Sequence, residues 1–251
     1  MISVKSIFKK YPKKVVVDDV TIDIKKGKVT SFIGPNGAGK STVLSIITRL
    51  TECDGGEVLI EGKPLKDWDK SDLSKKISIL KQSNNINLKL TVRELVSFGR
   101  FPHSQGRLTD EDEVKIDEAI EYMKLKEFED RYIDELSGGQ RQRAYIAMVI
   151  AQDTEYVFLD EPLNNLDMKH CVEMMKAVRS LCDNLGKTVI LVMHDINYTS
   201  CYSDYIVALK DGKMCKYGKT EEIIKEDVLN EIYDMDFDIQ NVDGRNICVY
   251  F

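Results

Sequence analysis

The spacing of hydrophobic residues separates strand-like from helix-like stretches of the chain. Apolar and polar residues alternate loosely over residues 1–27, which predicts antiparallel strands. Tyr156–Leu159 and Thr188–Met193 are apolar at almost every position, as is typical of strands buried in a parallel sheet. Spacings of three and four residues predict helices elsewhere. Their expected core positions are Val114, Ile116, Ala119, Ile120 and Met123, then Met168, Val172, Met175, Val178, Cys182 and Leu185.

Turn and cap signals mark the ends of further elements. Asp54-Gly55-Gly56 is expected to be a turn before a strand at residues 57–62, and Asp211-Gly212 to close a hairpin. The loop at residues 9–14 should interrupt the first strands. Capping residues are expected at Thr91 and Ser137, an acidic first helical turn is expected from Thr109, and Gly186 is expected to end a helix. Short helices at residues 221–225 and 228–233 and a last strand at residues 246–251 complete the expected order.

Helical patterns gather in the middle of the chain. We therefore expect one α/β domain over residues 1–251. Its core and an antiparallel β-subdomain would take residues 1–84 and 155–251, and a helical subdomain would be inserted at residues 85–154.

Composition limits the class of protein. The chain has 251 residues, 43% hydrophobic and 31% charged, with a net charge of −6. A nucleic-acid-binding domain usually carries a basic face, so this acidic balance argues against one. The longest apolar run, Tyr145–Ala151, is far shorter than the ~20 residues of a membrane span, and the N-terminus lacks a signal-peptide pattern. The six cysteines and three histidines lack zinc-site spacing, so buried or idle thiols are expected.

Residues 34–41, Gly-Pro-Asn-Gly-Ala-Gly-Lys-Ser, match the phosphate-loop pattern G-x-x-x-x-G-K-[ST] at every fixed position. A predicted strand, Val29–Ile33, precedes them and a predicted helix follows, so backbone N–H groups would surround an anion at a helix N-terminus. This context predicts a P-loop NTPase core. Lys40 would reach the β- and γ-phosphates, and the Ser41 hydroxyl would bind Mg²⁺. The predicted nucleotide contacts are Gly34, Pro35, Asn36, Gly37, Ala38, Gly39, Lys40, Ser41 and Thr42.

Charged residues follow two of the predicted buried strands. Asp160 and Glu161 end one of them, where α/β proteins place ligands and metals. Asp160 is expected to hold Mg²⁺, and Glu161 to orient or deprotonate a water molecule. His194 follows the other strand, at the same expected edge, and could meet a γ-phosphate.

Leu136-Ser137-Gly138-Gly139-Gln140 precedes a predicted helix. Ser137 and Gln140 could form a simple capping box, but each glycine costs on the order of 1 kcal/mol relative to alanine inside a helix. Backbone contact with an anion would explain both glycines. Because residues 34–41 already hold one set of phosphates, this second site suggests that two chains share a nucleotide.

Tyr11 allows two interpretations. It could be a turn aromatic packed on a strand edge, or an aromatic plate for a purine ring, since it lies upstream of the phosphate loop.

Taken in order, these motifs resemble those of the ATP-binding-cassette (ABC) ATPases, over essentially the whole chain. Leu136–Gln140 is identical to the family signature LSGGQ. The resemblance implies ATP and Mg²⁺ as cofactors, with Lys40, Glu161 and His194 as catalytic residues. It makes Tyr11 the adenine-stacking aromatic and Gln82 the Q-loop glutamine, a ligand of Mg²⁺ beside Ser41 and Asp160. It also implies nucleotide contacts from Ser137, Gly138, Gly139 and Gln140, and from Asp167 of the D-loop Asn165-Leu166-Asp167.

Within the family, residues 86–106 and 163–170 resemble ATPases of ferric-siderophore importers, in particular Gram-positive petrobactin-type catecholate importers. The Asn164-Asn165 pair departs from the commoner Ser-Ala but suits this subgroup. The resemblance implies a homodimer that powers a membrane permease from the cytoplasmic face, serves an extracellular siderophore-binding protein indirectly, and binds no nucleic acid. A cobalamin or haem importer and an exporter remain alternatives. A DNA-repair ATPase is remote, because the helical insertion is compact and lacks sustained heptads.

Overall fold

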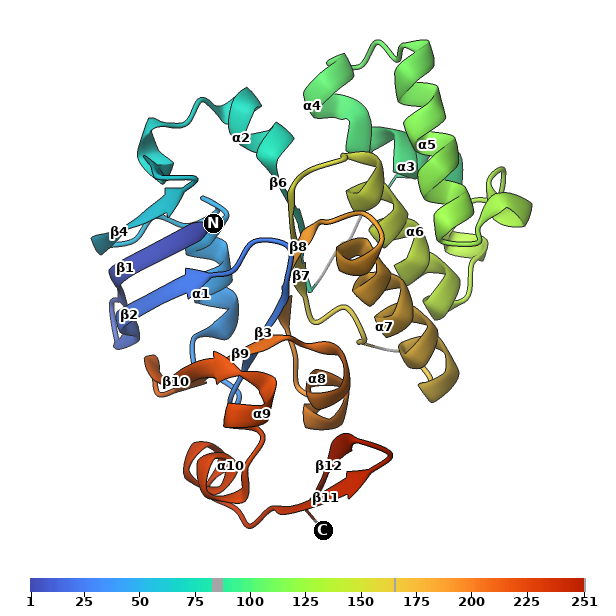
Figure 1. Cartoon of the computed structure of the whole chain (residues 1–251). Helices are drawn as coiled ribbons and strands as arrows, with labels where there is room; N and C mark the ends of the chain where they lie inside the picture. Colours follow the sequence, from blue (N-terminus) through green and yellow to red (C-terminus); the bar gives the residue numbers. More distant parts are fainter. Residues whose placement is uncertain (83–87, 165, 251) are drawn as a thin grey trace. The chain divides into compact units, whose positions relative to one another are not determined.

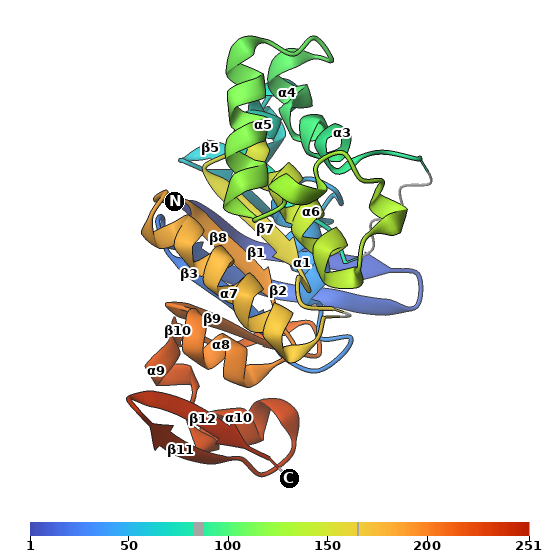
Figure 2. The same ribbon diagram turned by 90° about the vertical axis from the view of Figure 1, so that its right-hand side faces the viewer.

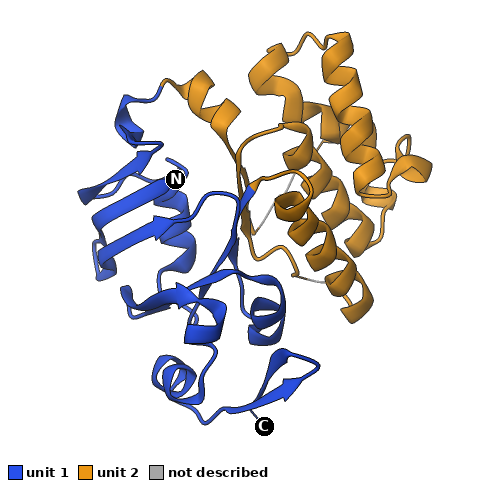
Figure 3. Cartoon of the chain, in the orientation of Figure 1, with its two compact units in different colours: residues 1–68, 188–251 blue, residues 69–187 orange. Residues whose placement is uncertain are grey.

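The computed structural model describes residues 1–82, 88–164 and 166–250. Its contacts divide the chain into unit 1, residues 1–68 and 188–251, and unit 2, residues 69–187 (Figure 3). The expected helical subdomain, residues 85–154, falls inside unit 2, and its exact bounds stay a prediction. Expectations that fall on Ser83–Asn87, on Asn165 and on Phe251 lie outside the described residues.

Unit 1 contains the antiparallel sheet that the alternating N-terminal pattern predicts. Its strand order is β2-β1-β4-β5, with Ile2 opposite Ile24 and Val4 opposite Ile22, and these four apolar side chains are buried. The strands are β1 (Ile2–Tyr11), β2 (Lys14–Ile24), β4 (Gly55–Ile60) and β5 (Lys63–Pro64), and η1 (Leu65–Asp67) is a short 3₁₀ turn.

Two local expectations for this sheet are wrong. Strand β1 runs through Lys9 to Tyr11, so the interruption is only a tight turn before Lys14. Gly55-Gly56 does not form a turn but opens β4. Gly56 has a φ of 77°, and a Cβ there would lie 2.2 Å from the Ser6 carbonyl oxygen. The glycine therefore permits a close approach between β4 and the irregular middle of β1, where the register with β4 shifts between Lys5 and Phe8.

A second group of strands in unit 1 carries the phosphate loop. Strand β3 (Val29–Ile33) pairs in parallel with β8 (Thr188–Val192) on one side and with β9 (Tyr205–Lys210) on the other. Every residue of β3 and β8 is buried, as their continuous apolar character predicts. The expected hairpin is confirmed, because β10 (Lys213–Lys219) pairs antiparallel with β9. Helices α1 (Lys40–Ile47) and α8 (Ile196–Tyr202) follow β3 and β8 (Figure 1).

The C-terminal part of unit 1 has the two short helices that were expected, α9 (Thr220–Ile223) and α10 (Glu226–Tyr233). The expected last strand is present at residues 245–249, but it pairs with a preceding strand that was not predicted. The chain forms a hairpin of β11 (Asp238–Val242) and β12 (Arg245–Val249). Asp243 and Gly244 both have positive φ, 50° and 75°, as two-residue hairpin turns of the type I′ class require. Strand β12 lies beside α8 (Figure 2).

Unit 2 pairs β6 (Ile77–Leu80) in parallel with β7 (Tyr156–Asp160). Its helices are α2 (Lys70–Lys76), α3 (Val92–Ser97), α4 (Phe101–Ser104), α5 (Asp110–Tyr122), α6 (Gly138–Ala151) and α7 (Met168–Asp183), with 3₁₀ turns η2 (Phe98–Arg100), η3 (Lys126–Phe128) and η4 (Ile133–Glu135). A capping box opens α3 at Thr91, as predicted, and another opens α5 at Thr109, where an acidic first turn was expected.

Helices α3, α5 and α6 pack together around buried apolar side chains. A buried ion pair ties them: Arg100 Nε donates to Asp112 Oδ1 at 2.7 Å, and Arg100 Nη1 donates to the Ala151 carbonyl at 2.9 Å. Asp112 is the third residue of α5 and also accepts hydrogen bonds from Thr109. One carboxylate therefore caps a helix and neutralises a buried arginine.

Some of the core positions predicted for α5 and α7 are wrong. Ile116, Ala119, Ile120 and Met123 are buried, but Val114 is 54% exposed because it lies off that face of α5. Met168 is the first residue of α7 and is 83% exposed, so it does not fill the core. Leu185 is 47% exposed because it lies beyond the helix end at Asp183. In the described part of the chain, no helix combines the length and apolar character that crossing a membrane requires.

Candidate functional site

The phosphate loop joins the buried end of β3 to the first turn of α1. Gly34 leaves the strand with a φ of 137°, and a Cβ there would lie 1.9 Å from the Leu209 carbonyl oxygen. Gly39 caps α1 with a φ of 97°, and a Cβ there would lie 2.5 Å from the Val16 carbonyl oxygen. Only glycine fits either position. Glycines at these two positions allow the tight backbone course between strand and helix that phosphate-binding loops take.

Lys40 is held inside the curve of this loop. Its side chain is 5% exposed, and Nζ donates to the carbonyl oxygens of Gly34, at 2.7 Å, and Pro35, at 3.0 Å. Ser41 and Thr42 are half-buried in the first turn of α1, whereas Asn36 and Gly37 are exposed. Ala38 is buried at the foot of the loop. The ammonium group is thus fixed where loop N–H groups and the helix N-terminus already favour negative charge.

His194 lies at the same edge of this sheet. Phe32 is opposite Val192 in the parallel β3–β8 pair, so the two strands end side by side. Strand β3 continues into the phosphate loop, and β8 continues toward His194. His194 is exposed. Asp195 next to it caps α8 by accepting from the Tyr198 N–H at 2.9 Å. This position would allow the His194 imidazole to contact the terminal phosphate of a nucleotide bound in the phosphate loop.

Tyr11 ends β1 and is 44% exposed. Lys9 Nζ lies 5.6 Å from the centre of its ring and forms an ion pair with Asp54 at 2.7 Å. The hydrogen bond with Asp54 raises the pKa of Lys9, and the same bond lowers the pKa of Asp54. The Tyr11 ring is exposed enough for a purine to stack on it, and the Lys9 ammonium group lies close enough for a cation–π contact. Both interpretations of Tyr11 stay open.

In unit 2, Asp160 ends β7 and is 8% exposed, and Glu161 follows with a φ of 52°. Gln82 follows β6, which runs parallel to β7 with Leu80 opposite Leu159. Gln82 Nε2 donates to Glu161 Oε2 at 2.7 Å. The Q-loop glutamine and the expected catalytic glutamate therefore meet at the carboxyl edge of this strand pair.

Sequence reasoning missed Asn164. Its Nδ2 donates to the same oxygen, Glu161 Oε2, at 2.6 Å. The turn that brings them together has a hydrogen bond of 3.3 Å from the Asn164 N–H to the Glu161 carbonyl. The sequence offered one signal for this contact: Asn164 carries an amide three residues after Glu161, with Pro162 between them.

The signature stretch opens α6 as a capping box. The Ser137 hydroxyl accepts from the Gln140 N–H at 3.3 Å, and Gln140 Oε1 accepts from the Ser137 N–H at 2.9 Å. Ser137 and Gly138 are exposed at the helix N-terminus, while Gly139 is buried. A Cβ on Gly139 would lie 3.0 Å from the His170 ring. A side chain at position 139 would crowd the His170 ring, so packing within the chain gives a second reason, besides contact with an anion, for a glycine there.

His170 also contacts the D-loop. Asp167 caps α7, and its Oδ1 lies 2.9 Å both from the His170 backbone N and from His170 Nδ1. These two bonds lower the pKa of Asp167, the backbone one most. His170 thus packs on the signature glycine and bonds to the D-loop aspartate.

The donor atoms expected for Mg²⁺ are the Ser41 hydroxyl, the Gln82 side-chain carbonyl and the Asp160 carboxylate. All are oxygens, which this hard cation prefers, so the residues fit the ion. Across the described residues, no group of three or more His, Cys, Asp or Glu side chains forms a separate metal-binding cluster.

Comparisons with known proteins cover the whole chain. The family model described as "ABC transporter" matches residues 17–164. The petrobactin import ATP-binding protein YclP of Bacillus subtilis is 59% identical, over 100% of both chains. The iron(3+)-hydroxamate import ATP-binding protein FhuC of the same organism is 42% identical over 91% of this chain and 86% of its own. A dimeric ATP-binding cassette solved with bound ADP and Pi is 33% identical, with a TM-score of 0.78 over 88% of this chain and 99% of its own. These matches confirm the fold class and the resemblance inferred from the motifs.

Proposed function

The chain belongs to the ABC transporter family, and from that premise we propose that it is the ATP-binding and hydrolysing subunit of a ferric-siderophore importer. The observation that carries the proposal is full-length identity of 59% to a petrobactin import ATP-binding protein. The catecholate siderophore petrobactin is accordingly the first substrate to test. ATPase activity itself is characteristic of the family, and this chain has its phosphate loop, signature and strand-end carboxylates.

The proposed reaction transfers the γ-phosphoryl group of ATP to water. The residue 34–41 loop and Lys40 hold the phosphates, and Tyr11 stacks on the adenine. Glu161 orients the water and takes its proton as the water oxygen bonds to the γ-phosphorus. The bond from that phosphorus to the bridging oxygen breaks, and ADP leaves with the electron pair. His194 contacts the γ-phosphate and stabilises its developing charge.

Mg²⁺ held by Ser41, Gln82 and Asp160 would neutralise phosphate charge when bound. The Gln82–Glu161 hydrogen bond gives this chain a way to hold the glutamate in a defined orientation. A change in the surroundings of Gln82 would therefore change the position of Glu161, which would link nucleotide chemistry to a neighbouring subunit.

The proposed working form is a homodimer on the cytoplasmic face of the cell membrane, attached to integral-membrane permease subunits. An extracellular siderophore-binding protein would take part only indirectly, by delivering cargo to the permease. Ser137–Gln140 and Asp167 of one copy would complete the nucleotide site of the other. The exposed position of Ser137 and Gly138 at the start of α6 supports this arrangement, because a second copy could reach these residues.

Uptake by cells that lack this gene tests the proposal. Cells carrying the wild-type chain should regain uptake of radiolabelled ferric petrobactin, while cells carrying Lys40→Ala or Glu161→Gln should not. Immunoblots and co-purification with the permease verify that the variants are present and assembled. Uptake of cobalamin or haem instead, or energy-dependent efflux, would replace the siderophore assignment with one of the alternatives.

A further inference from the structure

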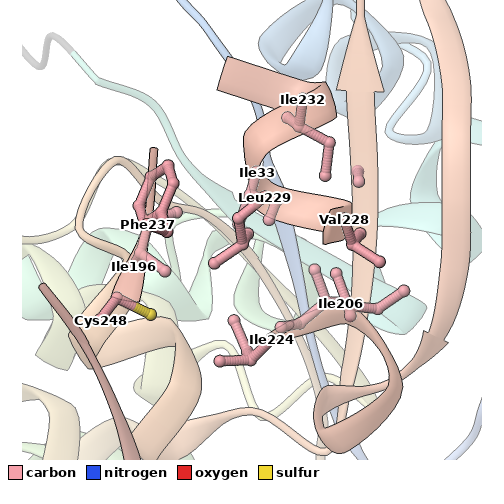
Figure 4. Close-up of a cluster of buried hydrophobic side chains, with 11 residues drawn as sticks. Ile33, Ile196, Ile206, Ile224, Val228, Leu229, Ile232, Phe237 and Cys248 are labelled. Carbon is pink, nitrogen blue, oxygen red and sulfur yellow. The ribbon is translucent and has the colours of Figure 1, made fainter. Parts of the chain in front are cut away.

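The C-terminal part of unit 1 packs against the strand that delivers the phosphate loop. Figure 4 shows Ile33, the residue before Gly34, in one buried cluster with Ile206 of β9, Leu229 of α10 and Cys248 of β12. These side chains are at most 2% exposed. Residues as far apart in sequence as Ile33 and Cys248 therefore share a core at the base of the loop.

Tyr233, the last residue of α10, extends this contact to the loop itself. Its hydroxyl oxygen accepts a hydrogen bond of 3.0 Å from the backbone N–H of Gly34. The ring packs on the cluster and lies 5.7 Å, centre to centre, from the Phe237 ring. Burial raises the pKa of the Tyr233 hydroxyl, which therefore stays neutral at physiological pH.

Gly34 is constrained from two directions. The Leu209 carbonyl lies so close that no Cβ fits, and the Tyr233 hydroxyl satisfies the N–H. Lys40 uses the Gly34 carbonyl as an acceptor at 2.7 Å. The first residue of the loop is thus held at its N–H by the C-terminal segment and at its carbonyl by Lys40.

The same segment holds the helix that follows His194. Asn197 of α8 bonds twice to the backbone of Cys248: its Oδ1 accepts from the N–H at 2.7 Å, and its Nδ2 donates to the carbonyl at 3.2 Å. The Ser200 hydroxyl donates to the Asn246 carbonyl at 2.7 Å. The start of the phosphate loop and the helix that follows His194 are therefore both held by contacts with residues 220–250.

We propose that Tyr233 is a positioning residue for nucleotide binding, which holds the start of the phosphate loop in its binding conformation through Gly34. The inference rests on the proposed role of residues 34–41 in binding ATP. A loop already fixed in the right shape loses less conformational freedom when the ligand binds, so removing the hydroxyl should weaken affinity. Tyr233 touches no nucleotide in this account and acts only through the loop.

Tyr233→Phe tests this in the full-length chain, because it removes the acceptor and keeps the ring in the cluster. The matched control is Tyr217→Phe, elsewhere in unit 1. The Tyr217 hydroxyl donates a hydrogen bond of 2.6 Å to the backbone carbonyl of Asp23, and the substitution removes it. Equilibrium binding of the magnesium complex of a non-hydrolysable ATP analogue should weaken about three- to tenfold in Tyr233→Phe, the range expected for one hydrogen bond. Tyr217→Phe should bind like the wild type.

In the complex with the permease, Tyr233→Phe should raise the KM for ATP and leave kcat at saturating ATP within about twofold. Thermal unfolding without nucleotide separates a loss of stability from a loss of affinity, and measuring binding at low temperature keeps a destabilised variant folded. Equal affinities in Tyr233→Phe and Tyr217→Phe would overturn the inference. If Lys40→Ala bound the analogue as tightly as the wild type, the phosphate-loop assignment itself would fail, which is a different result.

Discussion

Asn164 Nδ2 lies 2.6 Å from Glu161 Oε2, so an amide outside the expected motif residues holds the expected catalytic carboxylate. Gln82 Nε2 reaches the same oxygen at 2.7 Å. Two amide donors on one oxygen fix the rotation of the carboxylate about its terminal bond. A general base is effective only when it points at the proton that it takes, so this orientation bears directly on turnover.

Asn164→Ala should lower kcat for ATP about three- to tenfold, because one orienting hydrogen bond to the carboxylate is lost. Affinity for ATP should not change, because Asn164 is not expected to contact the nucleotide. Steady-state ATPase kinetics and equilibrium binding measure the two effects separately. Asn241→Ala, which removes a side-chain amide hydrogen bond in the β11–β12 hairpin, is the control. An unchanged kcat in Asn164→Ala would show that Gln82 alone suffices.

Tyr11→Ala should weaken ATP binding by about 1–3 kcal/mol if the ring stacks on adenine, the range for base–aromatic stacking. Tyr11→Phe should bind ATP nearly as well as the wild type, since it keeps the ring and its contact with Lys9. Fluorescent-nucleotide titration compares the three chains. Equal affinities throughout would assign Tyr11 to packing at the strand edge.

A mixed dimer tests whether two chains share each nucleotide. Lys40→Ala disables phosphate binding, and Ser137→Arg blocks the signature, so each variant alone should be inactive. Combined, the intact loop of the Ser137→Arg chain faces the intact signature of the Lys40→Ala chain. Some ATPase activity should return if one whole site suffices. Normal hydrolysis by Ser137→Arg alone, including with its permease, would mean that Ser137 only caps α6.

Asp112→Asn should destabilise unit 2 in a pH-dependent way. Burial favours the neutral acid, but hydrogen bonds from Thr109 and Arg100 outweigh it and hold the pKa of Asp112 at about 2. Because the folded pKa is below the unfolded value, the carboxylate stabilises the fold above about pH 4, and the effect fades as pH falls toward 2. At pH 7 the substitution should cost about 2 kcal/mol of unfolding free energy.

Urea unfolding at pH 7, 5 and 3 measures this dependence. The difference between Asp112→Asn and wild type should be full at pH 7 and 5 and smaller at pH 3. Asp110→Asn, an exposed change in the first turn of the same helix, should show a much smaller difference. A cost for Asp112→Asn that is the same at all three values would mean that packing, and not the ionised carboxylate, is responsible.

Local chemistry explains which features could be predicted from the sequence. The caps at Thr91 and Ser137 and the Asp211-Gly212 hairpin depend on residues a few positions apart, and the structure has all of them. The order of strand, phosphate loop and helix follows equally from adjacent residues.

Contacts between distant residues could not be predicted in this way. The Tyr233 hydroxyl meets Gly34 across 199 positions, and nothing near either residue signals the other. Strand β11 was missed because Ile239 and Val242 are its only apolar residues, too few for a recognisable alternation. Asn164 was within reach of Glu161, but a single polar residue in a turn carries no distinct pattern. The roles of the site residues themselves remain predictions.

The contact of His170 with Gly139 couples two positions that are 31 residues apart in sequence. A Cβ at position 139 would lie 3.0 Å from the ring, so the ring would have to move by a few tenths of an ångström to admit it. The same ring lies 2.9 Å from the Asp167 carboxylate, so a side chain placed in the signature would also disturb the side-chain contact of the D-loop aspartate. The effect of a substitution at Gly139 therefore cannot be assigned to the signature alone.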